Sequence, residues 1–327
     1  MQKEKVLVTG AGGMVGSHMV EVLWNQGLDV VGTYYKPTVD IEEIPSKIRL
    51  IQCDVRYWQN VLNIMIEFRP SRIFHLAAQS YPTVSWDQPF ATFDTNANGT
   101  VSIFESIKFI RKHFDPSYDP VVVVACSSAE YGSSFEKLPA GEKIKESAEL
   151  LPLHPYGVSK VCQDLLSYQY FANDKIRVIR ARIFNTTGAR KVNDVCSDFV
   201  SRAIKSFKRG DNPCHILVGN LDSHRAIQDC QDLISALLLL SEKGTWGDVY
   251  NICAQKTVTG RDIVKAIEKA LNTAIVCETD PKLLRPTDEK VIWGDVSKLV
   301  QDTGWKQTIA LEDTIRAMIE YRMKREG

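Results

Sequence analysis

Tyr156 and Lys160 are the residues of this chain whose types and spacing are best suited to acid–base chemistry. Four residues apart on a helix, their side chains share one face. A free tyrosine titrates near about pH 10, and a nearby ammonium lowers that pKa because it favours the phenolate. The pair therefore predicts a group that exchanges a proton with a sugar or alcohol hydroxyl. Since Y-x-x-x-K occurs in many helices without any role, the prediction depends on where this helix lies.

A second polar group follows residues 121–125, an apolar run that is typical of a strand buried on both faces. Ligands of parallel sheets bind at the carboxyl ends of the strands, so we expect Ser128 to hydrogen-bond the hydroxyl that Tyr156 deprotonates. Glu130, two residues on, is expected to point to the same side. There it can remove a proton from carbon next to a new ketone. The alternative for Glu130 is a carboxylate that caps a helix or lies at the surface.

Three glycines near the start of the chain, Gly10, Gly13 and Gly16, stand between an apolar run and a helical pattern. The first two let the backbone turn tightly and approach a phosphate, and the third lets helix and strand pack closely. The helix N-terminus offers free N–H groups to a pyrophosphate. A strand, a glycine turn and a helix in this order predict a dinucleotide site rather than a plain glycine-rich turn. With Tyr156 and Lys160, they indicate an oxidoreductase whose lysine also holds the nicotinamide ribose.

The choice of dinucleotide depends on the residues after the second apolar run, Thr33-Tyr34-Tyr35-Lys36. An acidic residue there would bind the ribose 2′-hydroxyl of NAD. Because a cation stands there and no carboxylate does, we expect NADP(H), with NAD(H) as the alternative. Lys36 either binds the 2′-phosphate or is a solvated loop charge. Asp54 is expected to bond the adenine amine or, alternatively, to cap the following helix.

Short apolar runs alternate with helical patterns through the first half of the chain. The expected strands are 6–9, 29–33, 49–53, 72–76, 121–125 and 177–184, and the expected helices are 14–26, 91–112 and 156–171. This alternation predicts an α/β fold, a Rossmann-type doubly wound parallel sheet, over residues 1–188. Residues 189–327 are expected to form a smaller, mixed α/β substrate lobe, with some exchange of chain between the two. Its expected strands are 216–218 and 249–252, and its helices are 229–242, 260–271 and 311–322.

Composition excludes several other classes of function. The formal net charge is zero, which argues against binding to nucleic acid or to an acidic membrane. Eight cysteines show no metal-ligand spacing, so neither structural zinc nor another metal is expected. Their scattered, apolar settings favour a reducing cytoplasm. No apolar stretch is long enough to span a bilayer.

The motifs together resemble the extended short-chain dehydrogenase/reductases. Within them the chain is similar to the GDP-mannose 4,6-dehydratases and the GDP-4-keto-6-deoxymannose reductases. The resemblance runs nearly end to end and is carried by Gly10–Gly16, His75–Ser80, Ser127–Ser128, Tyr156–Lys160, Phe184–Asn185, Val218–Leu221, Arg225, Arg285–Asp288 and Gly304–Trp305.

The resemblance implies roles for particular residues. Ser128, Tyr156 and Lys160 match the catalytic triad, and Glu130 matches the dehydratase base. The implied cofactor site comprises Gly10, Gly13, Met14, Val15, Gly16, Lys36, Asp54, Val55, Leu76, Ala77, Ala78, Tyr156 and Lys160. The implied substrate residues are Gln79, Ser80, Ser85, Ser128, Asn185, Val195, Arg225, Arg285 and Asp288. Of these, the two arginines match residues that hold a nucleotide diphosphate, for which a guanidinium fork is well suited.

The leading interpretation is a nucleotide-sugar 4,6-dehydratase, most similar to GDP-mannose 4,6-dehydratase, which yields a 4-keto-6-deoxy sugar. A reductase of such a ketosugar is the first alternative, followed by a C4 epimerase and a non-catalytic dinucleotide-binding relative. Ser128 in place of the usual threonine, and Tyr34–Pro37 in place of an arginine-rich segment, favour the reductase. Gln79-Ser80 and Val84–Trp86 favour the dehydratase. A homodimer or homotetramer is expected, through helices 91–112 and 156–171.

Overall fold

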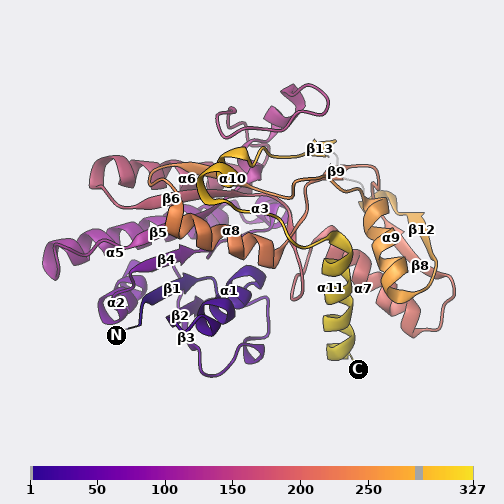
Figure 1. Ribbon diagram of the computed structural model, residues 1–327, viewed down its shortest axis with the longest axis horizontal. Coiled ribbons are helices and arrows are strands. Elements are labelled where there is room, and N and C mark those ends of the chain that lie inside the picture. The colour runs from indigo at the N-terminus through magenta and orange to yellow at the C-terminus, as the bar shows by residue number, and fades with distance from the viewer. Residues whose placement is uncertain (1–2, 284–289, 327) are drawn as a thin grey trace.

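The computed structural model describes residues 3–283 and 290–326 and is built around a parallel sheet of seven strands (Figure 1). The strand order is β11-β6-β5-β4-β1-β2-β3, and every neighbouring pair is parallel. The strands span β1 Lys5–Thr9, β2 Asp29–Tyr34, β3 Arg49–Gln52, β4 Arg72–His75, β5 Val121–Ser127, β6 Val178–Ile183 and β11 Val249–Ile252. The predicted Rossmann-type doubly wound sheet is confirmed, and each of the six strands expected in the first half is present.

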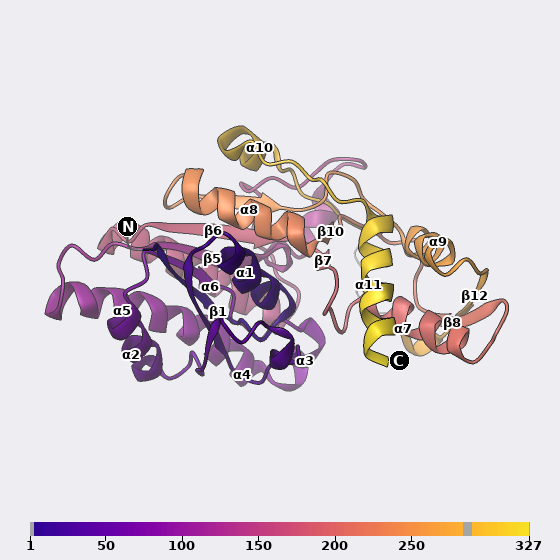
Figure 2. The ribbon, with the colours of Figure 1, turned by 60° about the horizontal axis from the view of Figure 1, so that its bottom comes forward.

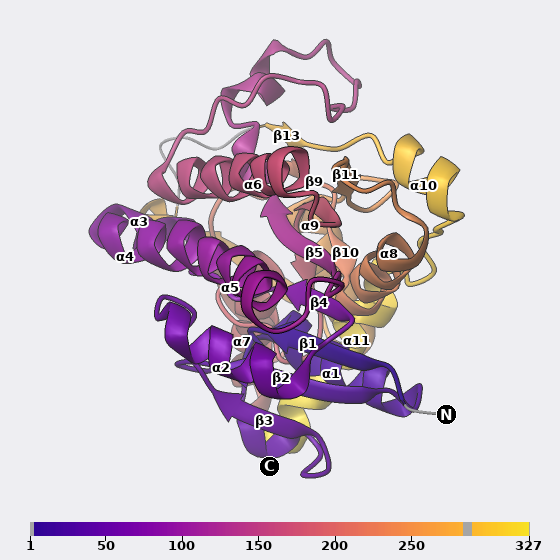
Figure 3. The same ribbon diagram turned by 90° about the vertical axis from the view of Figure 1, so that its left-hand side faces the viewer.

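Helices cover both faces of this sheet, which is seen nearly end-on in Figure 3. One face carries α1 (Met14–Asn25) and α8 (Cys230–Lys243), and the other carries α2 (Trp58–Phe68), α5 (Gly99–His113) and α6 (Pro155–Asp174). Successive strand side chains enter opposite cores: Val6 and Val8 pack with α1 and α8, whereas Leu7 packs with α2 and α5. Because both faces are covered, the strands read as continuous apolar runs.

The helix expected over residues 91–112 is divided in the structure. It consists of α4 (Pro89–Phe93), a π-helical segment η2 (Asp94–Asn98) and α5. Within the π segment Asn96 is buried, and its side chain bonds the backbone N–H and carbonyl of Gln79 and the hydroxyl of Ser159. This wider turn therefore joins three segments at the carboxyl end of the sheet.

A smaller lobe is formed by helices around its own apolar core, at the right of Figures 1 and 2. It contains α7 (Val195–Lys208), α9 (Gly260–Leu271), α11 (Leu311–Glu326) and the parallel pair β8 (Cys214–Val218) and β12 (Ile275–Thr279). Strand β11 was expected here, but it pairs with β6 as the edge strand of the large sheet. Helix α8 likewise packs on that sheet, so chain from the second half enters the first. The boundary at residue 188 stays a prediction.

Short elements connect these units. The short helices are α3 Pro82–Asp87, α10 Ser297–Thr303, η1 Ile41–Glu43, η3 Ser128–Glu130, η4 Ser133–Lys137 and η5 Pro281–Leu283. The short strand pairs are β7 Thr186–Thr187 with β10 Gln228–Asp229, and β9 His224–Arg225 with β13 Val291–Ile292. Within the described ranges, none of the helices combines the length and the apolar character that crossing a bilayer requires.

Candidate active site

The glycine turn lies between the carboxyl end of β1 and the first turn of α1, where the strand order changes direction between β1 and β4. Gly10 has φ +76°, and a Cβ there would lie 2.8 Å from the backbone nitrogen of Ala77. A Cβ on Gly16 would overlap the carbonyl oxygen of Gly10. Only glycine fits either position, and the N–H groups that begin α1 remain available to an anion. The turn therefore fits the pyrophosphate of a dinucleotide.

The other residues of the expected cofactor site surround this turn. Met14 and Val55 are buried, and Val15, Leu76, Ala77 and Ala78 are partly buried. The backbone N–H groups of Leu76 and Ala77 both donate to the hydroxyl of Thr9, which holds the end of β4 against the end of β1. These positions follow the carboxyl ends of β1, β3 and β4, and their contact with a dinucleotide stays a prediction.

A pair of cations marks the end of this edge, after β2 and β3. Lys36 is exposed, with its ammonium 5.4 Å from the ring centroid of Tyr35. Arg56 lies 5.7 Å from the same ring and binds both carboxylate oxygens of Asp54, at 2.6 and 3.0 Å. Asp54 also accepts the backbone N–H of Arg56, so it is bound within its own turn. Arg56 was not expected from the sequence as a partner of Asp54, although a basic residue two positions after Asp54 could have indicated this ion pair.

Tyr156 and Lys160 lie in the first turns of α6, and both are buried. The helix begins at Pro155, and the imidazole of His154 caps it by accepting the N–H of Gly157 at 3.0 Å. The Lys160 ammonium is 5.8 Å from the Tyr156 ring centroid, so the two residues share one face as predicted. Burial raises the pKa of Tyr156 to about 12, although a hydrogen bond with Ser127 opposes the rise. Burial lowers the pKa of Lys160 to about 8.

The serine that is hydrogen-bonded to Tyr156 is Ser127. Strand β5 continues through Ser127, and the 3-10 turn η3 starts at Ser128. The Ser127 side chain hydrogen-bonds Tyr156 and also accepts the N–H of Ala129 at 3.2 Å. Ser128, which is partly buried, occupies the next position on the turn. Ser127 is next to Tyr156 because the strand is two residues longer than its apolar run. The hydrogen bond expected between Ser128 and the substrate hydroxyl stays a prediction.

Glu130 is bound by groups of the protein itself. Its side chain is fully buried, and its carboxylate accepts the backbone N–H of Ser127 at 2.7 Å and lies 3.1 Å from Arg182 Nε. With Ser127 it forms a reciprocal cap of η3, which is the helix-cap alternative left open for this residue. Burial and neighbouring Asp164 raise the pKa of Glu130 well above its usual range, against the opposing charge of Arg182.

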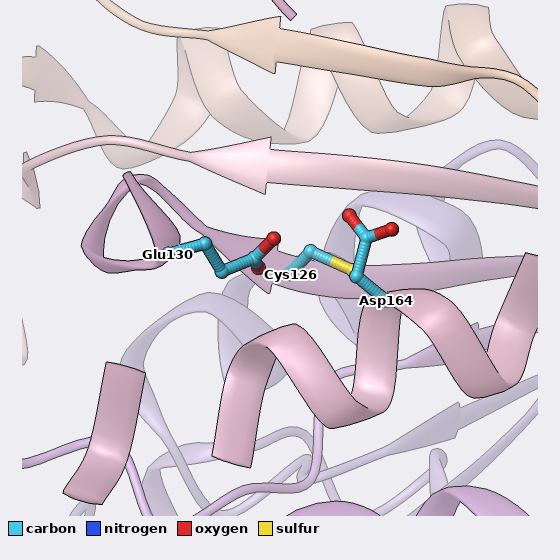
Figure 4. A group of neighbouring side chains, drawn as sticks. All are labelled: Cys126, Glu130 and Asp164. Carbon is cyan, nitrogen blue, oxygen red and sulfur yellow. The ribbon is translucent and has the colours of Figure 1, made fainter. Parts of the chain in front are cut away.

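Glu130 belongs to a buried ionic cluster, which comprises Glu130, Asp164, Arg180 and Arg182. Asp164 of α6 binds Arg180 at 2.5 Å and Arg182 at 3.0 Å, both on β6. Figure 4 shows Glu130 and Asp164 gathered beside Cys126, and their ligand atoms lie within 4.8 Å of one another. Over residues 3–283 and 290–326, Cys126, Glu130 and Asp164 are the one group of three side chains that could together hold a metal ion. Arg182 binds both acidic side chains and Arg180 binds Asp164, so both acids already have partners within the protein.

The expected substrate residues are more scattered. Gln79 is held by Asn96 and Thr92, whereas Ser85 is fully buried and donates to the carbonyl of Pro82 at 2.6 Å. The remaining described positions are accessible: Ser80, Asn185, Val195 at the start of α7, and the partly buried Arg225 on β9. Arg285 and Asp288 lie outside the described residues.

Comparisons with known proteins identify the family. A family model described as GDP-mannose 4,6 dehydratase matches residues 7–318. The chain belongs to that family. It is 26% identical to GDP-6-deoxy-D-mannose reductase of Pseudomonas aeruginosa, over 99% of both chains. It is 23% identical to GDP-mannose 4,6-dehydratase of Yersinia enterocolitica, over 97% of this chain and 93% of that one.

A solved structure supports the fold. The crystal structure of Thermus thermophilus UDP-glucose 4-epimerase in complex with NAD has a TM-score of 0.83 and 26% identity, covering 97% of this chain and 98% of that one. The predicted resemblance to the extended short-chain dehydrogenase/reductases is therefore confirmed.

The ionic cluster yields a prediction about stability. Arg182→Met should lower the free energy of unfolding by about 3–5 kcal/mol, because it leaves two buried carboxylates short of a partner. Arg49→Met is the matched control, since it removes an exposed pair with Glu67 at 2.6 Å and should cost no more than about 1 kcal/mol. Denaturant unfolding of both variants measures the difference. Equal losses would contradict the account of the cluster.

Proposed function

We propose that this member of the GDP-mannose 4,6-dehydratase family is an NAD(P)H-dependent reductase of a nucleotide-linked 4-keto-6-deoxy sugar. A dehydratase needs a carboxylate that can reach the carbon next to the ketone. The carboxylate whose charge acts on Tyr156 is Glu130. It is fully buried and paired with Arg182, and this single observation supports the reductase over the dehydratase.

The protonation of Tyr156 agrees with reduction. A reductase needs a phenol that gives its proton to the developing alkoxide at C4, whereas oxidation of a C4 hydroxyl starts from a phenolate. With a pKa of about 12, Tyr156 holds its proton at neutral pH. Ser127 is placed to hydrogen-bond the same substrate oxygen, and the Lys160 ammonium favours the phenolate that remains. A bound NAD(P)H supplies the hydride for the C4 carbon.

NADPH is the coenzyme that the cation pair after β2 and β3 favours. Lys36 and Arg56 both lie beside Tyr35, and the 2′-phosphate of NADP carries charge that a guanidinium or an ammonium recognises. Asp54 is bound by Arg56 and is not placed as a free acceptor for a ribose hydroxyl. The glycine turn and Lys160 would hold the rest of the dinucleotide.

A GDP-linked sugar is the proposed substrate. The family description names GDP-mannose, and the Pseudomonas aeruginosa relative at 26% identity is a GDP-6-deoxy-D-mannose reductase. Arg225 is the described arginine expected to hold the diphosphate. The dehydratase remains the second candidate because the family description and the Yersinia enterocolitica relative name that activity. For it, Glu130 would have to leave Arg182.

A homodimer or homotetramer is proposed through the outer surface of α5 and α6. Val158, Leu165 and Tyr168 of α6 are 42%, 54% and 49% exposed, and Phe114 at the end of α5 is 54% exposed. Apolar side chains that gather on one helical face indicate an interaction surface.

The activity assay separates the two candidates. The purified protein is mixed with GDP-4-keto-6-deoxymannose and either NADPH or NADH, and with GDP-mannose and catalytic NADP+. We expect oxidation of one NADPH per ketosugar, slower turnover with NADH, and no ketosugar from GDP-mannose. Formation of a 4-keto-6-deoxy sugar from GDP-mannose without added reductant would make the protein a dehydratase. Recovery of a C4 epimer, or no turnover in either mixture, would also overturn the proposal.

A pair of serine variants tests the active-site hydroxyl. Ser127→Ala should lower kcat for ketosugar reduction about 10²-fold, because it removes a donor to the developing oxyanion. Ser128→Ala should leave kcat close to the wild-type value, since Ser128 lies one residue beyond the contact with Tyr156. Steady-state kinetics measure both, with thermal unfolding to show that each variant is folded. A larger loss in Ser128→Ala would restore the residue expected from the sequence.

A further inference from the structure

The Lys160 ammonium is held by two acceptors inside the protein. It donates to the backbone carbonyl of Ala125 on β5 at 2.8 Å and to the side-chain oxygen of Gln163, one turn along α6, at 2.7 Å. An ammonium carries three N–H donors. These two bonds therefore leave one donor of Lys160 for the ligand side of the helix.

Gln163 can offer its oxygen to Lys160 only if its amide nitrogen faces the other way. That nitrogen donates to the hydroxyl of Thr100 on α5 at 2.7 Å, and the Thr100 proton goes to the carbonyl of Asn96 at 2.7 Å. Since this hydroxyl has no second proton to give, a flipped Gln163 amide would set two acceptors against each other. Both ends of the fully buried Gln163 side chain are thus matched to a partner.

His75 of β4 links Thr100 to Thr9, at the end of β1, by two further hydrogen bonds. The Thr9 hydroxyl accepts two backbone N–H groups, so its own proton points to His75 Nδ1 at 2.9 Å. The proton of the neutral imidazole is then on Nε2, which lies 3.2 Å from the Thr100 oxygen and donates to it. Burial lowers the pKa of His75 to about 3, and the charge of Lys160 acts in the same direction.

We propose that Gln163 is a positioning residue that aims the Lys160 ammonium at the nicotinamide ribose, and that Thr100, His75 and Thr9 lock its amide in the required orientation. The inference rests on the proposed function, since it concerns the same dinucleotide site. A carboxamide does not exchange protons readily, so the chain of hydrogen bonds orients Lys160 and does not carry protons away from it.

Other groups also influence the pKa of Lys160, and their effects are present in the wild-type protein before any residue is replaced. Burial disfavours the ammonium, while Cys126 of β5 and Glu130 of η3 favour it. His75 faces it from β4 and Tyr156 from its own helix. None of these groups changes when Gln163 is replaced, so a shift in the titration of Lys160 in the Gln163 variants reports on the Gln163 contact. Thr100→Val also takes the acceptor from His75 Nε2, so the Thr100 variants are compared with each other, valine against serine.

The experiment measures the Kd of NADPH by fluorescence titration from about pH 6 to pH 10. In the wild-type protein, binding should weaken above about pH 8, as Lys160 loses its charge. Gln163→Met removes the acceptor, so Kd at neutral pH should rise about tenfold and the weakening should begin at lower pH. Gln163→Glu places an anion at the same distance, so the weakening should move to higher pH. A merely structural role would not move the two variants in opposite directions.

Thr100 supplies the second variant pair. Thr100→Val removes the hydroxyl that orients Gln163 and should shift binding in the direction of Gln163→Met, whereas Thr100→Ser keeps the hydroxyl and should bind as the wild type does. Cys162→Ala, at the neighbouring helix position, is the matched control and should leave Kd unchanged.

Two results would overturn the inference, and they are distinguishable. If the wild-type protein binds NADPH and the Gln163 variants bind equally well with the same pH dependence, only the role of Gln163 fails. If the wild-type protein binds neither NADPH nor NADH, the proposed reductase fails with it. Should Gln163→Met not fold, the Gln163→Glu shift and the Thr100 pair decide the question.

Discussion

A carboxylate that is removed from water must be paired, and this constraint governs the active site. Glu130 is fully buried and reaches Arg182, while Asp164 joins Arg182 to Arg180. Breaking such a pair is expensive because it leaves an uncompensated charge in the interior. The same carboxylate holds the N–H of Ser127 and so sets the place where β5 ends and η3 begins. The ionic cluster thus holds the backbone of Ser127 beside Tyr156, and under the proposed function it withholds a base from the substrate.

Tyr156 and Lys160, by contrast, are hydrogen-bonded to uncharged groups. Lys160 is surrounded by a carbonyl and a carboxamide, and Tyr156 by a serine hydroxyl. Burial has the largest effect on both residues: it raises the pKa of the phenol and lowers the pKa of the ammonium, while the charge of Glu130 raises both pKa values. The charged side chains of the ionic cluster thus come from η3, α6 and β6. The groups left for the ligand are the phenol of Tyr156, the hydroxyl of Ser127 and one N–H of the Lys160 ammonium.

Much of this could be predicted from the sequence, because local pattern determines it. The glycine turn, the buried strands and the i, i+4 spacing of the tyrosine and lysine each depend on neighbouring residues alone. Which serine lies beside Tyr156 could not be predicted, since the hydrophobic pattern does not show that β5 continues two residues past its apolar run. The direction of Glu130 depends on Arg182, which is 52 residues away in the sequence. Strand β11 was misplaced for the same reason, because its partner β6 comes from the other half of the chain.

The central claim is that a protonated Tyr156 gives its proton to the substrate without help from a carboxylate base. The pH dependence of kcat/KM for reduction of GDP-4-keto-6-deoxymannose by NADPH tests it most directly. The account predicts a level rate from about pH 6 to about pH 8 and a fall above, as Lys160, with its pKa of about 8, loses the ammonium. An acid limb in that range, from a carboxylate that must be ionised, would contradict the account, since it would return Glu130 to the chemistry.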